Sequence, residues 1–176
     1  IQFFKHPGDL NSNNFKNIVY TALQLKQIEW AENFVENYYS KVSLIEQENT
    51  YNFNYARIYF EKGDYKTAMR QLLKVTYEDS FYASTGRILL IKCYYQLNDE
   101  MPLISCCMSL IQFLNRSKDF TKQRVENNLH FIKYVKTLQK HRLEKDRSYF
   151  KKLYSKVKDS TVVEKEWLLK KIEDLY

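Results

Sequence analysis

Apolar positions recur along the first two thirds of the chain at an interval of 35 residues. Equivalent apolar residues stand in five columns that keep this offset without gaps. These columns are Ile18/Phe53/Ile88, Leu23/Ile58/Cys93, Leu25/Phe60/Tyr95, Phe34/Met69/Ile104 and Tyr38/Leu73/Met108. A short polar turn divides each repeat, at 26–29, 61–64 and 96–99. Such an interval is typical of stacked supersecondary units, and the pattern predicts that each unit is two tightly joined helices.

The second repeat contains residues suited to the local tasks of a helix pair. Gly63 can adopt the left-handed backbone that ends a helix, and Asp64 can cap the helix that follows. Ala68 is small enough to let two helices approach closely, while Tyr59 and Tyr65 can fill the space between them. The sequence therefore predicts a helical hairpin over this repeat.

These residues, together with Leu72 and Val75, resemble the signature of the tetratricopeptide repeat. In the first and third repeats, Asn33 and Leu103 stand where the signature has a small residue. The resemblance covers residues 11–115 and implies an all-α fold, an α-solenoid of antiparallel helix hairpins. It also implies a non-enzymatic scaffold that binds proteins or peptides.

Three other stretches, 25–34, 79–82 and 165–172, resemble the C-terminal part of large uncharacterised Bacteroidetes proteins. That likeness implies a bacterial protein and assigns no activity to it. The first eight residues contain no initiator methionine and no signal-peptide pattern. We therefore interpret the chain as part of a longer protein.

The pattern changes after residue 115. An i, i+3/i+4 stripe of apolar residues predicts one long helix over 117–143, and further apolar spacing predicts a second helix near 145–158. The stripe consists of Val125, Leu129, Ile132, Val135 and Leu138. A third helix is expected to open at Ser160, with a capping box from Thr161 to Glu164, and to bury Val163, Trp167, Leu168 and Ile172. We thus expect hairpins over 1–115 and helices over 116–176 that cap the solenoid.

The basic excess of the chain lies in this C-terminal part. Residues 116–176 hold 17 basic and 9 acidic residues, a net charge of +8, whereas residues 1–115 hold 11 and 12, a net of −1. The candidate basic surface consists of Arg124, Lys133, Lys136, Lys140 and Arg142. Three interpretations stay open: a solvated helix face, a surface for an acidic protein partner, and a surface for nucleic acid. Aromatic residues here fall mostly on the apolar stripe, which argues against base stacking and so against nucleic acid.

The first helix of each hairpin offers a second candidate site. In tetratricopeptide proteins these helices line the inner groove, and the resemblance places Phe53, Arg57, Phe60, Lys92 and Tyr95 there. Arg57 and Lys92 are one repeat apart, so they could grip carboxylates of an extended peptide. Phe60 and Tyr95 could supply apolar pockets. In the alternative interpretation, this face packs against other parts of the same longer chain.

Residue usage argues against several other classes of protein. Three Gly and two Pro are too few for the turns of an all-β fold or for a Gly-rich phosphate loop. His6, His130 and His141 lack metal-ligand spacing, and no catalytic motif is present, so we expect no enzyme activity, no cofactor and no metal site. No segment has the roughly 20 apolar residues of a membrane span.

The three cysteines, Cys93, Cys106 and Cys107, have apolar neighbours and are expected to be buried free thiols, which suggests a reducing cytoplasm. The leading functional hypothesis is a protein-protein interaction scaffold. The alternatives are a structural C-terminal arm of a larger protein whose activity lies upstream, and nucleic-acid binding through 116–158.

Overall fold

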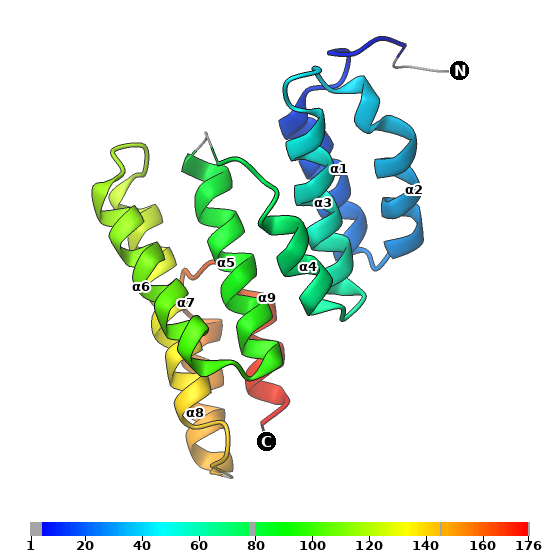
Figure 1. Ribbon diagram of the computed structural model, residues 1–176. Helices are drawn as coiled ribbons and strands as arrows, with labels where there is room; N and C mark the ends of the chain where they lie inside the picture. The colour runs from blue at the N-terminus through cyan, green and yellow to red at the C-terminus, as the bar shows by residue number, and fades with distance from the viewer. Residues whose placement is uncertain (1–4, 78–79, 145, 176) are drawn as a thin grey trace. The chain divides into compact units, whose positions relative to one another are not determined.

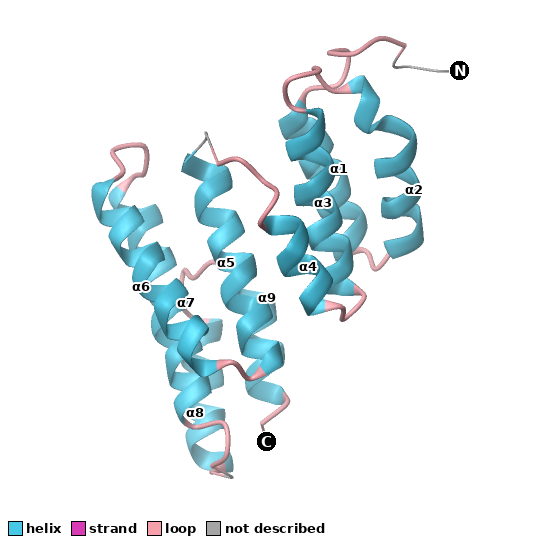
Figure 2. Cartoon of the chain, in the orientation of Figure 1, coloured by secondary structure: helices cyan, strands magenta, loops and turns pink. Residues whose placement is uncertain are grey.

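The regular structure of the chain is helical. A computed structural model describes residues 5–77, 80–144 and 146–175, and within them it contains helices and turns but no strand (Figures 1 and 2). The helices are α1 (Ser12–Gln24), α2 (Ile28–Tyr38), the 3-10 turn η1 (Tyr39–Lys41), α3 (Gln47–Glu61), α4 (Tyr65–Leu72), α5 (Ser80–Leu97), α6 (Glu100–Arg116), α7 (Lys122–Lys140), α8 (Arg147–Lys158) and α9 (Lys165–Glu173). The predicted all-α class is confirmed.

The chain divides into two compact units, unit 1 at residues 1–97 and unit 2 at residues 98–176. Helices α1 to α5 belong to unit 1, and α6 to α9 belong to unit 2. The third predicted hairpin is therefore divided between the two units, whereas the sequence pattern placed a boundary at 115. Two residues named in the predictions lie outside the described residues. They are Asp79, in the stretch 79–82, and Lys145, in the helix expected near 145–158.

Each predicted turn contains one residue with a left-handed backbone. These residues are Lys26 (φ 59°), Gly63 (φ 82°) and Asn98 (φ 56°). The interval from Lys26 to Gly63 is 37 residues and that from Gly63 to Asn98 is 35, so the constant offset of 35 is wrong for the first interval. An offset of 35 from Gly63 would place the first left-handed residue at position 28, but it comes two residues earlier, because α1 already ends at Gln24.

The earlier turn also changes which residue of α2 is equivalent to Ala68, the small buried residue of α4. Ala31, rather than Asn33, follows its turn at the same distance as Ala68 follows Gly63, and both alanines are fully buried. Asn33 is exposed. The first hairpin therefore does carry a small residue at the close approach of its helices, where the sequence alignment had placed an asparagine.

Short polar side chains cap the N-termini of α1, α4, α7 and α8. Asn11 Oδ1 accepts a hydrogen bond from the backbone N–H of Asn13 (2.8 Å) ahead of α1, and Asp64 Oδ1 accepts one from Thr67 (3.0 Å) ahead of α4. Thr121 and Asp146 cap α7 and α8 in the same way. Each cap satisfies a backbone donor that the helix itself leaves unpaired. The predicted roles of Gly63 and Asp64 are confirmed.

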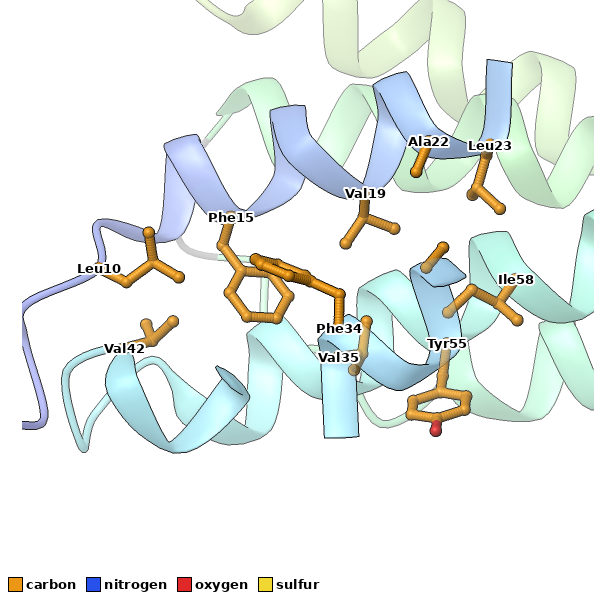
Figure 3. Close-up of a cluster of buried hydrophobic side chains, with 11 residues drawn as sticks. Leu10, Phe15, Val19, Ala22, Leu23, Phe34, Val35, Val42, Tyr55 and Ile58 are labelled. Atoms are coloured by element: carbon orange, nitrogen blue, oxygen red, sulfur yellow. The ribbon is translucent and has the colours of Figure 1, made fainter. Parts of the chain in front are cut away.

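The core of unit 1 is centred on two phenylalanines (Figure 3). The rings of Phe15 in α1 and Phe34 in α2 lie 4.9 Å apart, and Val42 closes one end of the cluster. Ile58 and Tyr55 of α3 complete it, which ties the third helix to the first pair. Helix α1 contacts both α2 and α3, so this one cluster holds the first three helices together.

The core of unit 2 joins α7, α8 and α9. Buried residues of the three helices are Phe131, Ile132, Tyr134, Val135, Leu138, Phe150, Leu153, Val157, Leu168, Leu169 and Ile172. The predicted capping box does not form, because α9 begins only at Lys165 and Glu164 precedes it with a left-handed backbone (φ 57°) and no side-chain cap. Val163 and Trp167, which were expected inside, are only half-buried.

Candidate functional site

Helix α7 has two faces of different character. Its inward face packs Phe131, Val135 and Leu138 at helical spacing, which fixes the orientation of the helix in unit 2. Its outward face carries Lys133, Lys136 and Lys140, all exposed. Since these lysines are three and four residues apart, they form one row that runs about 10 Å along the helix.

Helix α6 also has two apolar rows, and only one of them is buried. Leu103, Cys107, Leu110 and Leu114 are packed inside unit 2. The second row, which we call the open row, consists of Met101, Ile104, Met108 and Ile111. In the open row, the two methionines are 78% and 54% exposed and the two isoleucines are half-buried. An apolar row in this state is a surface on which another molecule can bury area.

A groove of about 640 Å³ lies between α6 and α7. The three lysines and two residues of the open row, Ile104 and Ile111, line it, whereas Met101 and Met108 follow the same row of α6 outside its lining. Its lining comprises Glu100, Leu103, Ile104, Ile111, Leu129, Ile132, Lys133, Lys136, Thr137, Gln139, Lys140, His141 and Tyr149. Apolar side chains from both helices form part of this lining, and the three lysines add cations from α7. Among these described residues Glu100 supplies the one carboxylate, so the groove favours an anionic occupant.

One end of the groove is held together by polar contacts. Asn98 Oδ1 accepts hydrogen bonds from Gln139 Nε2 (3.1 Å) and Arg142 Nη1 (3.2 Å), so the start of α6 lies beside the end of α7. His141 Nδ1 lies 2.5 Å from Glu144 Oε2. The Tyr149 ring of α8 lies 4.8 Å from the His141 ring, and burial, with Glu144 nearby, raises the pKa of the Tyr149 hydroxyl.

The structure brings together three of the five residues predicted to form a basic surface. Lys133, Lys136 and Lys140 line the groove. Arg142 lies past the end of α7 and contacts Asn98, and Arg124 lies in the first turn of α7, with its guanidinium 5.4 Å from the Phe120 ring centroid. The open row of α6 was not predicted as part of a site. Its i, i+3, i+7, i+10 spacing was the available signal.

The residues predicted to line an inner groove lie in the packing of unit 1. Phe53, Phe60 and Tyr95 are buried. The Arg57 guanidinium stands 5.0 Å from the Phe53 ring centroid, and Lys92 Nζ stands 4.5 Å from that of Phe60. The rings of Phe60 and Tyr95, which were predicted to supply apolar pockets, are therefore covered, and peptide binding through these five residues stays a prediction.

Two properties bear on the chemistry available to the chain. Among the described residues, no group of three or more His, Cys, Asp or Glu side chains is arranged to hold a metal ion. In the same part of the chain, no helix combines the length and the apolar character that crossing a bilayer requires.

The cysteines are free thiols, as predicted: Cys93 and Cys107 are buried and Cys106 is half-buried. Burial raises the pKa of the Cys107 thiol to about 12. Since only the thiolate reacts, we expect Cys93 and Cys107 in the folded protein to react with a disulfide reagent at least about 100-fold more slowly than in urea. A time course of thiol titration at pH 8 measures this. Rapid reaction of two or more thiols in the folded protein would contradict the placement of these cysteines.

Comparison of the chain with protein-family models, with curated proteins and with solved structures found no match in any of the three. The class that the fold defines is an all-α protein of helices joined by short turns.

Proposed function

We propose that the chain is a non-enzymatic protein-binding module, a short α-solenoid of hairpins similar to tetratricopeptide repeats, whose C-terminal helices dock an acidic protein segment. The observation that carries the proposal is the groove in unit 2, which the lysine row of α7 lines together with Ile104 and Ile111 of the open row of α6. The apolar row offers area to bury, and the lysine row selects for carboxylates.

The distribution of aromatic residues favours a protein over a nucleic acid as the partner. A nucleic-acid surface that stacks bases needs exposed rings between its cations. In unit 2, Phe131, Tyr134 and Phe150 are buried, and Tyr149 and Tyr154 are half-buried. The lysine row shares the groove with leucines and isoleucines instead, which suits the apolar side chains of a peptide.

A displayed library of random peptides tests this proposal. The wild-type chain is expected to select sequences with net negative charge and several apolar residues. The triple variant Lys133→Glu/Lys136→Glu/Lys140→Glu is expected to bind the selected peptides about 10- to 100-fold more weakly, since each exposed charge pair contributes modestly. Fluorescence anisotropy with labelled peptides gives the dissociation constants.

The matched control is Lys151→Glu/Lys152→Glu/Lys156→Glu, which makes the same change in net charge on exposed positions of α8. It should leave the dissociation constants within about threefold of wild type, because none of the three lysines lines the groove and exposed charges that make no contact are screened by salt. An equal loss in both variants would mean that overall charge, and not the groove, governs binding. Selection of peptides without acidic residues would overturn the proposal.

A further inference from the structure

The open row of α6 and the lysine row of α7 share one spacing along their helices. The steps of the open row are three, four and three residues, which correspond to about 4.5, 6.0 and 4.5 Å along the helix axis. The lysine row repeats the first two of these steps. Alternating steps of three and four residues form the stripe along which one helix packs against another, whereas side chains on one face of a strand are about 6.7 Å apart.

The groove is lined by the side chains of helices, and such a lining favours a helix over an extended strand as its occupant. Backbone N–H and C=O groups within α6 and α7 bond inside their own helices, so they cannot pair with an extended peptide. A strand in this groove would leave its backbone groups facing apolar side chains, which is unfavourable. A helix satisfies its own backbone and brings only side chains to the surface.

We infer that the occupant of the groove is an acidic amphipathic α-helix that lies along α6. Its apolar residues, at i, i+3 or i+4, and i+7, pack against Met101, Ile104, Met108 and Ile111. Its aspartates or glutamates lie on the edge that faces Lys133, Lys136 and Lys140. The open row extends about 15 Å, which corresponds to roughly ten residues of a helix. This inference rests on the proposed function and specifies its partner.

Charge argues against a second copy of the chain as the occupant. In a two-fold dimer the same face meets itself, so the lysine rows of both copies would come together at the interface. Like charges across an interface oppose association. An acidic helix has the complementary charge, and the single carboxylate among the described lining residues, Glu100, lies at the start of α6.

Two synthetic peptides that differ in their capacity to form a helix test the inference on the whole chain. Both carry glutamates and leucines in the amphipathic pattern above. One is locked as a helix by a side-chain crosslink between positions i and i+4, and the other has the same crosslinkable residues left open and a central proline on the face away from the groove, which breaks a helix without removing an apolar side chain. We expect the locked peptide to bind at least about tenfold more tightly by fluorescence anisotropy, since preorganisation removes the entropy of ordering.

A pair of neutral variants locates the binding. Met101→Ser/Met108→Ser, at exposed positions, is expected to weaken binding of the locked peptide by at least about tenfold, through lost apolar burial. The control Leu44→Ser/Leu73→Ser removes two apolar side chains of similar exposure, 75% and 80%, from unit 1 and should leave binding unchanged. Equal losses in the two variants would overturn the inference.

The outcomes separate this inference from the proposed function. If the peptide with proline binds as tightly as the locked one, the helical occupant is wrong, while selection of acidic peptides from the library would still support protein binding. If neither peptide binds and the library gives no acidic sequences, both proposals fail. Self-association in sedimentation, or binding to vesicles of anionic lipid, that the methionine variant abolishes would assign the open row to a second copy or to a lipid surface and would overturn the inference.

Discussion

Replacement of Phe131 by alanine is expected to lower the free energy of unfolding of unit 2 by about 3–5 kcal/mol, the range found for buried phenylalanines. Phe131 is fully buried in α7, and its ring centroid lies 6.1 Å from that of Trp167 at an interplanar angle of 50°. Trp167 is close to the start of α9, so this pair links two helices of the unit. The loss combines the removal of apolar burial with a cavity that the neighbouring side chains fill incompletely.

Urea unfolding followed by tryptophan fluorescence measures the change. The chain has two tryptophans, and a Trp30→Phe background, at a half-exposed position in unit 1, leaves Trp167 as the reporter. His130→Ala removes an exposed side chain from the neighbouring position of α7 and should change the stability by less than about 0.5 kcal/mol. A loss below about 1 kcal/mol for Phe131→Ala would show that this ring does not lie in a packed core.

In unit 1, substitution of Phe15 by alanine is expected to have an effect of the same size, about 3–5 kcal/mol. Phe15 is fully buried, and its ring packs against Phe34 (Figure 3). Phe34 in turn stacks on Trp30, with ring centroids 5.3 Å apart. The cluster connects α1 to α2 and α3, so the cavity lies where three helices meet. Little of it can be refilled without moving one of them.

Trp30 reports on this substitution when Trp167 is replaced by phenylalanine. The control Asn17→Ala removes an exposed polar side chain two residues further along α1 and should leave the unfolding midpoint nearly unchanged. Equal midpoints for Phe15→Ala and Asn17→Ala would exclude the packing in Figure 3. A lower midpoint with an unchanged denaturant slope would identify a loss of stability alone.

The helices and the turns between them could be predicted because helical periodicity and turn residues are local properties. Gly63 and Asp64 are residues whose backbone and side-chain preferences act within one turn of a helix, and both were placed correctly. The early first turn was not predictable in the same way. A gapless alignment favours apolar matches such as Phe34 with Met69. The position of the turn depends instead on the left-handed backbone of Lys26, and the residue type lysine does not predict that conformation.

The candidate site shows a different limit. Helix α6 contains two apolar rows that both alternate steps of three and four residues, and nothing within the helix says which one packs inside. That choice is made by the neighbouring helices, which bury Leu103 and Leu110 and leave Met101 and Met108 open. The rings of Phe60 and Tyr95 were predicted to line open pockets, but they are buried. The residue type could not decide between the two, since an aromatic side chain suits an open pocket and a closed core equally well.

Two of the left-handed turn residues lower the stability of the chain because they are not glycine. Lys26 and Asn98 adopt a backbone conformation at φ 59° and 56° that glycine enters without steric strain, and a side chain such as lysine raises its energy by about 1 kcal/mol. The folded state tolerates this strain in two of the three turns that follow α1, α3 and α5. Substitution of glycine at either position is therefore expected to raise the free energy of unfolding. A lineage that acquired glycine there would tolerate more destabilising substitutions elsewhere.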